Sequence, residues 1–411
     1  MSNYHNNKIP ELLVPANNLT VLKYAVNYGA DAVYAGGKDF NLRSIRGNFT
    51  LDELKSAVNY AHEYGVKVYF TLNSIINEDE LDKLREYLKE LKKIGIDGII
   101  VADFGVLRIV REFLPQISIH ISTQVNLNNS EAINLFKKMG AERVNVAREV
   151  CFSDLKKIIE NTDIEIEVFV HGALCISYSG RCMLSRYMTG RDANKGKCVQ
   201  SCRWKYFLME EKRPNMFFPV VQDKKGTYIY NSRDLCLLGR LKDIAGIGVD
   251  AIKIEGRMKT ENYVSLTAWV YRKALDWIKE NEFTEEKLSY LMYELDKCSH
   301  RNFTEGFMFL KDKTELESND NVGYVRKYRF VGVYDSYNEK YKGPVIKVKN
   351  QFRRGEIMDI LMPGKEPIGL KITKILSSPD ESEIAVANPN DLAVLCGMGK
   401  VSEYSLFRIK S

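Results

Sequence analysis

Eight short apolar runs are spaced along the first 255 residues, and stretches with helical periodicity lie between most of them. The runs are Glu11–Pro15, Asp31–Gly36, Val66–Leu72, Gly98–Asp103, Ile117–Ser122, Arg143–Arg148, Glu165–His171 and Ala251–Glu255. Parallel strands need a long crossover between neighbours, usually a helix, so this alternation predicts a parallel sheet. Eight such units favour a TIM-like (βα)8 barrel. An open doubly wound sheet is the alternative, but no GxGxxG follows the first run.

Helix boundaries between these runs carry their own signals. Thr50 and Glu53 have the spacing of a capping box, and helical patterns cover Glu80–Ile94 and Ser130–Met139. Four glycines follow helical patterns where a C-cap glycine belongs: Gly29, Gly65, Gly95 and Gly140. The pattern predicts alternating helices and strands in this half of the chain.

The regular alternation is interrupted between the seventh and eighth runs. Residues 172–250 are too long for one strand-to-helix segment, and they hold five of the eight cysteines. Because this insertion leaves the C-terminal end of a strand, we expect it on the active-site face of the barrel. With the following helical patterns, Asn262–Glu280 and Glu285–Lys297, it completes a predicted catalytic domain over residues 1–320.

A second, smaller domain is predicted over residues 325–411. Short alternating runs separated by Gly/Pro turns indicate a small antiparallel β-barrel or sandwich. The expected strands are Phe330–Tyr334, Pro344–Val348, Glu356–Leu361, Ile368–Ile375 and Glu383–Val386. Residues 321–411 hold 15 Lys and Arg against 10 Asp and Glu, which accounts for most of the net charge of +6. This excess fits either a solvated basic face or a surface for RNA.

The composition excludes several classes of protein. With 45% hydrophobic and 28% charged residues, the chain is neither disordered nor of low complexity. No apolar run approaches the roughly 18–20 residues of a membrane-spanning helix, so no membrane partner is expected. The N-terminus is polar and lacks the apolar core of a secretory signal. We therefore expect a cytoplasmic protein.

The clustered cysteines predict a metal centre, because disulfides are disfavoured in a reducing compartment. Cys175, Cys182, Cys198, Cys202 and Cys236 can supply four thiolates to a [4Fe–4S] cluster or to zinc. Only Cys198 and Cys202 form the tight pair that zinc sites usually show twice, so the spacing favours iron and sulfur. Some of the five can instead be ordinary buried cysteines.

Few residues offer the chemistry of a protease. Of five histidines, only His171 lies beside the cysteines at a predicted strand end, and no HExxH is present. A His171–cysteine pair would compete with metal ligation. Other candidates follow predicted strands, where barrel enzymes place their sites. They are Arg43, Asn73, Asp103, Gln124, Arg148, Glu149, Glu255 and Arg257.

The segment Glu167–Ser185 reads EVFVHGALCISYSGRCMLS and resembles the signature of peptidase family U32, the collagenase-like protease family. The likeness extends to ELLVPA, DAVYAG, NLR and Ile254–Arg257 in the barrel half. The stretch RDANKGKCVQSCRW is similar to a subgroup associated with tRNA modification. The resemblance implies hydroxylation of uridine 34 of tRNA at ring position 5, dependent on prephenate. Other members hydroxylate ribosomal RNA or a quinone precursor, and these stay alternatives beside a U32-type peptidase.

The resemblance also implies a ligand set and roles for the candidates. It places a [4Fe–4S] cluster on Cys175, Cys182, Cys202 and Cys236, with Cys198 as the alternative ligand. We predict catalytic roles for His171, Glu149 and Glu255. Substrate binding is predicted for Arg43, Arg148, Arg257 and Gln124, since arginines suit the two carboxylates of prephenate. A paralogous partner protein is a further expectation, because some relatives act as pairs.

One loop also has the composition of an RNA-binding surface. Residues 186–206 mix Lys and Arg with Tyr187, Trp204 and Tyr206, which suits phosphate contact and base stacking. A solvated loop whose aromatic side chains cover the cluster is the alternative. A third class, a non-catalytic RNA-binding protein with structural zinc, is also consistent with these features.

Overall fold

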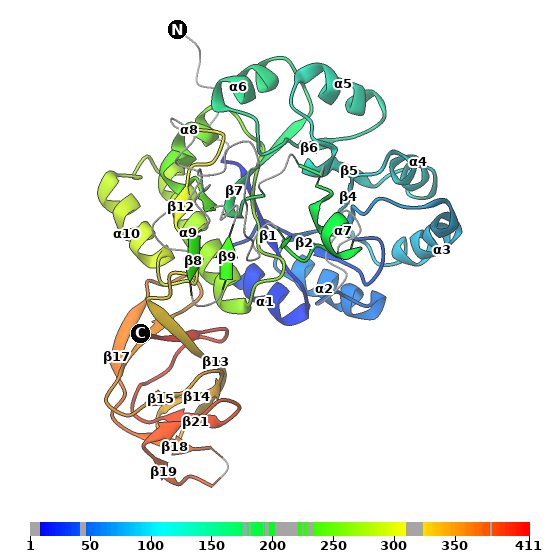
Figure 1. Cartoon of the computed structure of the whole chain (residues 1–411). Helices are drawn as coiled ribbons and strands as arrows, with labels where there is room; N and C mark the ends of the chain where they lie inside the picture. Colours follow the sequence, from blue (N-terminus) through cyan, green and yellow to red (C-terminus); the bar gives the residue numbers. More distant parts are fainter. Residues whose placement is uncertain are drawn as a thin grey trace.

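The computed structural model describes residues 9–41, 47–175, 179–180, 182–191, 193, 197–201, 221–223, 226–228, 233–309, 324–378 and 380–411. Figure 1 shows an α/β barrel seen along its axis, with a β domain attached at its lower side. The described helices include none with the length and apolar character needed to cross a bilayer. Arg43 and Cys202 lie outside the described residues.

Eight parallel strands form the barrel. The strands are β1 (Glu11–Pro15), β2 (Ala32–Gly36), β3 (Lys67–Leu72), β4 (Gly98–Val101), β5 (Ser118–Ile121), β6 (Arg143–Asn145), β7 (Glu165–Ala173) and β11 (Ala251–Ile254). Seven predicted runs each contain one of them, and the remaining strand, β7, extends two residues beyond the predicted run Glu165–His171. The eight strands pair in the order β11-β1-β2-β3-β4-β5-β6-β7, and β11 also pairs with β7. This last pairing closes the sheet, so the predicted TIM-like barrel is confirmed and the open sheet is wrong.

Helices surround the barrel as the alternation predicted. They are α1 (Leu19–Asn27), α2 (Leu51–Glu63), α3 (Leu81–Leu91), α4 (Phe104–Phe113), α5 (Ser130–Lys138), α6 (Phe152–Glu160), α8 (Leu241–Gly246), α9 (Glu261–Lys279) and α10 (Glu285–Leu295). The predicted capping box is present: the Glu53 N–H donates to Thr50 Oγ1 over 3.2 Å, and the Thr50 N–H donates to Glu53 Oε2 over 2.8 Å. The four predicted C-cap glycines all have positive φ angles, between 71° and 98°.

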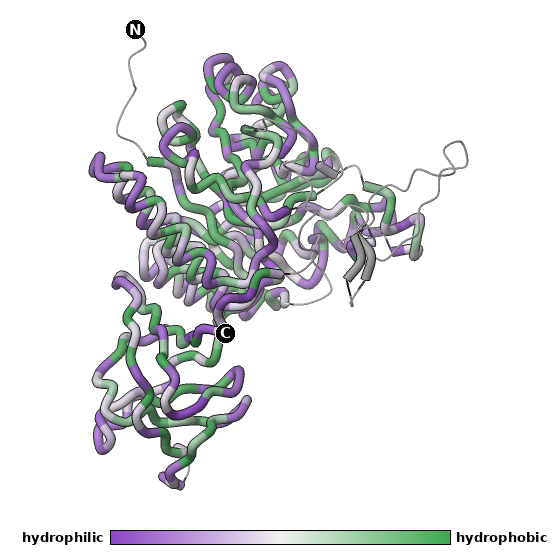
Figure 2. Tube along the Cα trace, turned by 60° about the vertical axis from the view of Figure 1, so that its left-hand side comes forward, coloured by the Kyte–Doolittle hydropathy of each residue, from purple (hydrophilic) through white to green (hydrophobic). Residues whose placement is uncertain are grey.

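Apolar residues on the outer side of the strands pack against the helices and form the main core. Leu12, Val14, Val33, Val68 and Ile99 are each fully buried there. Figure 2 shows green, hydrophobic stretches running through the strands, while purple residues recur on the outer helices. A smaller apolar cluster, which includes Tyr34 and Tyr69, is separate from this core.

The insertion adds strands that the sequence did not reveal. β10 (Asp234–Cys236) runs antiparallel to β7, and β12 (Phe303–Thr304) extends the sheet beside β10. The insertion also holds α7 (Leu184–Thr189) and a hairpin of β8 (Val221–Asp223) and β9 (Gly226–Tyr228). Figures 1 and 2 together place α7 on the side that faces the reader in Figure 1, beyond the C-terminal ends of the barrel strands.

The C-terminal part is an antiparallel sheet, as predicted. Its order is β17-β16-β22-β13-β14-β21-β18-β19. The strands are β13 (Tyr328–Asn338), β14 (Gly343–Val348), β16 (Ile357–Leu361), β17 (Ile368–Lys371), β18 (Ile375–Ser377), β19 (Glu383–Ile384), β21 (Leu392–Leu395) and β22 (Leu406–Lys410). A separate pair joins β15 (Phe352–Arg353) and β20 (Val386–Ala387).

Two details of this sheet differ from the prediction. The expected strand Ile368–Ile375 is divided into β17 and β18, which have different partners: β17 pairs with β16, whereas β18 pairs with β19 and β21. Strand β22 lies in the middle of the sheet, between β13 and β16, although the sequence analysis did not identify it. The predicted boundary at residues 320–325 lies largely outside the described residues and stays a prediction.

A buried polar seam joins the two parts. Lys297 Nζ of the barrel half lies 2.7 Å from Glu294 and 2.6 Å from Asp359 of β16. Arg408 of β22 donates to Asp359 over 2.8 Å and lies 3.6 Å from Glu294. Tyr28, the C-cap residue of α1, also reaches the other domain. Its hydroxyl proton is shared between the carbonyl oxygens of Leu361 and Tyr404, each 2.9 Å away. We call the four charged residues the seam cluster.

Candidate functional site

The predicted site residues that the structure describes lie at one end of the barrel. Gln124 follows β5, and Arg148 and Glu149 follow β6. His171 lies within β7, and Glu255 and Arg257 follow β11. Parallel strands end at the same rim, so this arrangement gathers the side chains around the C-terminal mouth of the barrel.

Glu149 fixes the cysteine-rich insertion to this mouth. Its carboxylate accepts the Ser179 N–H over 2.6 Å and the Ser179 hydroxyl over 3.2 Å. Gly180 then lies so close to Gln124 that an added Cβ would approach the Gln124 carbonyl oxygen to 2.1 Å. Glu149 and Gln124 therefore hold the turn between Cys175 and Cys182 against the barrel.

Two of the three arginines predicted to bind substrate, Arg148 and Arg257, lie in the described residues, and they are held in different ways. Arg257 is 4% exposed, and it donates to Thr71 Oγ1 over 2.7 Å and to the side-chain oxygen of Asn41. A side chain at Gly36 would meet Arg257 Nη1 at 2.5 Å, so this glycine makes room for the guanidinium. Arg148 is half-buried and stacks over the Phe169 ring at 4.0 Å. Both contacts fix guanidinium groups at the mouth.

Other strand-end residues have local explanations. Asp103 accepts the backbone N–H groups of Gly105 and Val106 and so caps α4. The backbone oxygen of Glu255 accepts the Tyr263 hydroxyl over 3.0 Å. The position of Asp103 after β4 thus reflects the start of a helix.

His171 is a buried, neutral histidine. It is 2% exposed and packs among Tyr263, Tyr271 and Phe303, with Nδ1 3.4 Å from the Tyr271 hydroxyl. Burial lowers the pKa of His171 to about 3, although Asp234 acts in the opposite direction. A ring in this state can accept a hydrogen bond, but it is a poor general base near neutral pH.

Cys236 lies directly opposite His171 on β10. Its thiol is buried, and Sγ lies 3.9 Å from the Tyr271 hydroxyl. Burial raises the pKa of Cys236 to about 11, so the thiol is protonated at neutral pH in these surroundings. The pair therefore does not show the activated thiolate that a cysteine protease needs.

The other described cysteines of the cluster belong to the insertion. Cys175 is exposed, while Cys182 and Cys198 are half-buried, and all are free thiols. Ser185 accepts the Val199 N–H over 3.2 Å and donates to the Arg191 carbonyl over 2.8 Å. This clasp ties the segment around Cys198 to the start of α7, two residues after Cys182.

The four described thiols have the chemistry of an iron–sulfur or zinc site, but they do not converge in this arrangement. Within the described parts of the chain, no three His, Cys, Asp or Glu side chains come together as a metal site. Cys202 could complete a set only from outside those parts. Cluster ligation therefore stays a prediction from the sequence.

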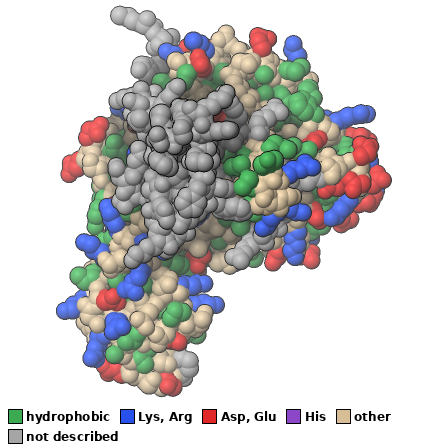
Figure 3. Space-filling view, viewed as in Figure 1, with side chains coloured by type: hydrophobic (Ala, Val, Ile, Leu, Met, Phe, Trp, Pro, Cys, Tyr) green, Lys and Arg blue, Asp and Glu red, His purple; other side chains and the backbone are tan. Residues whose placement is uncertain are grey.

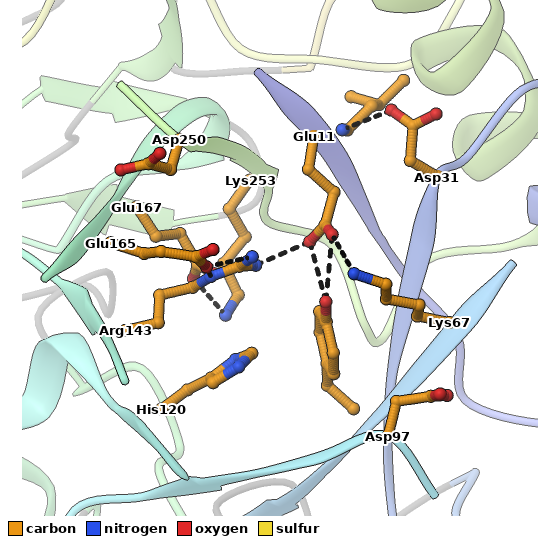
Figure 4. Close-up of polar contacts among 12 residues, drawn as sticks. Glu11, Asp31, Lys67, Asp97, His120, Arg143, Glu165, Glu167, Asp250 and Lys253 are labelled. Carbon is orange, nitrogen blue, oxygen red and sulfur yellow. Dashed lines mark hydrogen bonds and ion pairs between the residues drawn. The ribbon is translucent and has the colours of Figure 1, made fainter. Parts of the chain in front are cut away.

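Below the mouth, strand residues form an ionic network that sequence reasoning missed. Lys253 Nζ lies 2.7 Å from Glu167, and Arg143 lies 2.6 Å from both Glu11 and Glu165 (Figure 4). We call these five residues the floor cluster. The signal was present as single charges within apolar strands, for example Lys253 in Ala-Ile-Lys-Ile.

A recess lies at this floor. A cavity of about 570 Å³ is lined by residues that include Lys67, Tyr69, His120 and Arg143. Lys67 and Arg143 are the first residues of β3 and β6, so the cavity opens at the N-terminal end of the barrel, which in barrel enzymes serves stability. The insertion and the gathered polar side chains place the candidate site at the opposite end.

Comparison with known proteins covers nearly all of the chain. The family model described as peptidase family U32 matches residues 17–318, and that of the peptidase family U32 C-terminal domain matches residues 326–408. The chain is 38% identical over 364 residues to a Bacillus subtilis protein named tRNA hydroxylation protein P1. That alignment covers 87% of this chain and 84% of the relative.

Two further relatives carry different names. A Methanocaldococcus jannaschii protein named as an uncharacterized protease is 40% identical over 329 residues, 79% of each chain. An Escherichia coli 23S rRNA 5-hydroxycytidine synthase is 34% identical over 304 residues, 72% of this chain and 45% of the relative. Two of these three names state hydroxylation of RNA, and the third states proteolysis.

Proposed function

The chain belongs to peptidase family U32, and on that basis we propose that it is an RNA hydroxylase acting on tRNA. In finer detail, we propose that it adds a hydroxyl group to ring position 5 of uridine 34, in a reaction that depends on prephenate. The observation that carries the proposal is the likeness to tRNA hydroxylation protein P1 over 87% of the chain. A pyrimidine is also the base modified by the relative that acts on 23S rRNA.

The barrel mouth supports this assignment over proteolysis. A serine or cysteine protease needs a nucleophile beside a competent base. His171 and Cys236 lie opposite each other on β7 and β10, and both side chains are buried away from a peptide substrate. The named relative that suggests proteolysis is itself uncharacterized. Peptidase activity is the second candidate function, and the name of that relative is what supports it.

We further propose that the insertion carries an iron–sulfur cluster at the mouth. Cys175, Cys182 and Cys236 would supply three thiolates, and Cys198 or Cys202 the fourth. The Ser185 clasp ties the Cys198 segment to the start of α7, close in sequence to Cys182. When bound, such a cluster would supply electron transfer or substrate activation.

The chain's own residues have definite tasks in this proposal. Glu149 would keep Ser179 and the neighbouring cysteines against the mouth through its two hydrogen bonds. Arg148 and Arg257, fixed by Phe169 and Thr71, would provide positive charge for the carboxylates of prephenate. Arg43 remains a predicted third contact. An obligatory paralogous partner also stays a prediction.

Nucleoside mass spectrometry of tRNA tests the function directly. Deletion of the gene should remove nucleosides derived from 5-hydroxyuridine at the wobble position, and a plasmid copy should restore them. Unchanged nucleosides in a strain that also lacks any paralogue would contradict the assignment. Gelatin cleavage by the purified protein that is blocked by thiol alkylation would instead favour the peptidase.

Iron and sulfide content tests the ligands separately from activity. Cys175→Ala should lose iron and sulfide together with tRNA modification, whereas Cys151→Ala outside the cluster should keep both. Comparing Cys198→Ala with Cys202→Ala identifies the fourth ligand, since only the true ligand should lower the iron content. Full modification by a Cys175→Ala protein without iron would exclude the cluster.

A further inference from the structure

An exposed tyrosine ring lies within reach of two cations where the barrel mouth meets the C-terminal domain. The Tyr324 side chain is 45% exposed. Lys259 Nζ lies 5.2 Å from the centre of its ring, and Arg326 Cζ lies 5.9 Å from it. Both distances are within the range of cation–π attraction. We call Lys259, Tyr324 and Arg326 the rim platform.

Backbone contacts fix the platform at the rim. The Val325 N–H donates to the His300 carbonyl over 2.8 Å, which fixes the chain directly after Tyr324. The Lys259 N–H donates to the Gly256 carbonyl over 2.8 Å. Lys259 therefore belongs to the same short loop after β11 that carries Glu255 and Arg257, two of the predicted site residues.

The cations of the platform are available to an anion. Neither Lys259 nor Arg326 has a carboxylate within ion-pair distance among the residues that the structure describes. A second Lys–Tyr pair in the C-terminal domain shows the contrast. Lys340 lies 4.8 Å from the Tyr341 ring, but both side chains contact the carboxylate of Glu381. That pair is neutralised, whereas the rim platform carries two positive charges.

The surroundings add to this charge. Figure 3 shows Lys and Arg side chains spread over the C-terminal domain on the face that it shares with the barrel mouth. A flat aromatic face flanked by cations matches an unpaired nucleotide, whose base stacks on the ring while its phosphate meets the positive charge. A protein partner fits the platform less well, because its side chains do not repeat a flat ring next to a phosphate as a nucleotide does.

We propose that the rim platform binds single-stranded RNA, with Tyr324 stacking one base and Lys259 and Arg326 holding the adjacent phosphates. The proposal rests on the proposed function for the identity of the RNA, and it assigns the contact that holds nucleotides flanking the target uridine. Because Lys259 and Arg257 share one loop, the platform lies beside the predicted site. The inference makes the junction of the two domains part of substrate recognition.

Binding of an anticodon stem-loop tests the platform. The probe is a synthetic RNA stem-loop with unmodified uridine at the wobble position, and fluorescence anisotropy gives its affinity for the full chain. Tyr324→Leu should weaken binding by about 5- to 150-fold, the loss expected for one stacked base. Tyr324→Phe should bind like the original chain, because it keeps the ring. Arg326→Gln should reduce the slope of log K against log salt by about 0.7.

The neutralised pair gives the matched control. Tyr341→Leu should leave the affinity unchanged, and thermal unfolding should show that every variant is folded. Equal binding by Tyr324→Leu and the original chain, or an equal loss in Tyr341→Leu, would overturn the proposal. If Tyr324→Leu binds normally while deletion still removes the hydroxylated nucleosides, the platform is wrong and the proposed function stands. If the original chain does not bind the RNA and gene deletion leaves the nucleosides unchanged, both the platform and the proposed function are wrong.

Discussion

The floor cluster and the seam cluster are both buried and both ionic, but they are assembled differently. In the floor cluster, each side chain comes from a barrel strand, and Arg143 and Glu165 are direct partners in the register of β6 and β7. In the seam cluster, Lys297 follows α10, while Asp359 and Arg408 belong to β16 and β22 of the other domain. Barrel closure sets the floor pairs, whereas the Lys297–Asp359 and Arg408–Glu294 contacts of the seam exist only when the domains dock.

This difference separates two tasks of buried charge. The floor cluster contributes to the barrel itself, and its Lys253 lies over the same Phe169 ring that holds Arg148 of the candidate site. The seam cluster fixes the C-terminal domain relative to the barrel mouth and so fixes the position of the rim platform between them. Removal of one partner of a buried ion pair leaves the other charge buried and uncompensated, which is strongly destabilising. Single substitutions should therefore show what each cluster stabilises.

The largest effect is expected for Lys253→Met. Burial lowers the pKa of Lys253 despite the attraction of Glu167, whose carboxylate is 2% exposed. Removal of the cation leaves that carboxylate buried, and among the described residues its remaining polar neighbours are Asn145 at 2.6 Å and Arg143 at 3.8 Å. We expect a loss of about 3–5 kcal/mol in the free energy of unfolding, measured in urea. The double variant Lys253→Met/Glu167→Leu should recover much of this loss, and failure to do so would contradict the argument.

Arg408→Met should have a smaller effect on stability and a larger effect on domain docking. The Arg408 side chain is fully buried, but Lys297 still contacts both Glu294 and Asp359 after its removal. We expect a loss of about 1.5–3 kcal/mol, the range for hydrogen bonds to charged groups. Calorimetry should show two separated unfolding transitions. A single transition at a lower temperature would mean that the seam does not couple the domains.

Protonation of His120, which lines the floor cavity, should lower the stability of the protein at acidic pH. Burial, together with Arg143 and Lys253, holds the pKa of His120 well below its ordinary value of 6.5. The unfolded chain therefore binds a proton that the folded chain does not, so stability falls as pH drops below about 6.5. The expected slope is about 1.4 kcal/mol per pH unit for this residue. His120→Gln should reduce the pH dependence of the free energy of unfolding, measured in urea from pH 6.5 to 5. An unchanged slope would mean that other groups cause this pH dependence.

The smallest effect should come from an exposed pair that serves as a reference for both clusters. Lys89 and Glu86 on α3 lie 2.6 Å apart, with side chains 54% and 70% exposed. Glu86→Gln should change the free energy of unfolding by less than about 0.5 kcal/mol, because water screens the pair. A loss as large as that of Arg408→Met would show that burial does not explain the difference between these pairs.

The candidate site was predictable in location more than in detail. Its position followed from the C-terminal ends of parallel strands, and the structure places Gln124, Arg148, Glu149, Glu255 and Arg257 there. The sequence could not show that Glu149 holds Ser179, since the two lie 30 residues apart. Nor could it show that His171 is enclosed by aromatic rings from α9 and β12.

By itself, the sequence determined the eight-stranded barrel, the capped helices and the β character of the C-terminal part. Those features depend on periodicity and on local signals such as Thr50 and Glu53, which act within a few residues. Only the tertiary structure decided the central place of β22, the partners of Lys253 and Arg408, and the meeting of Lys259 with Tyr324. These contacts join segments far apart in the chain, so their energies depend on which surfaces the closed barrel and the docked domain bring together.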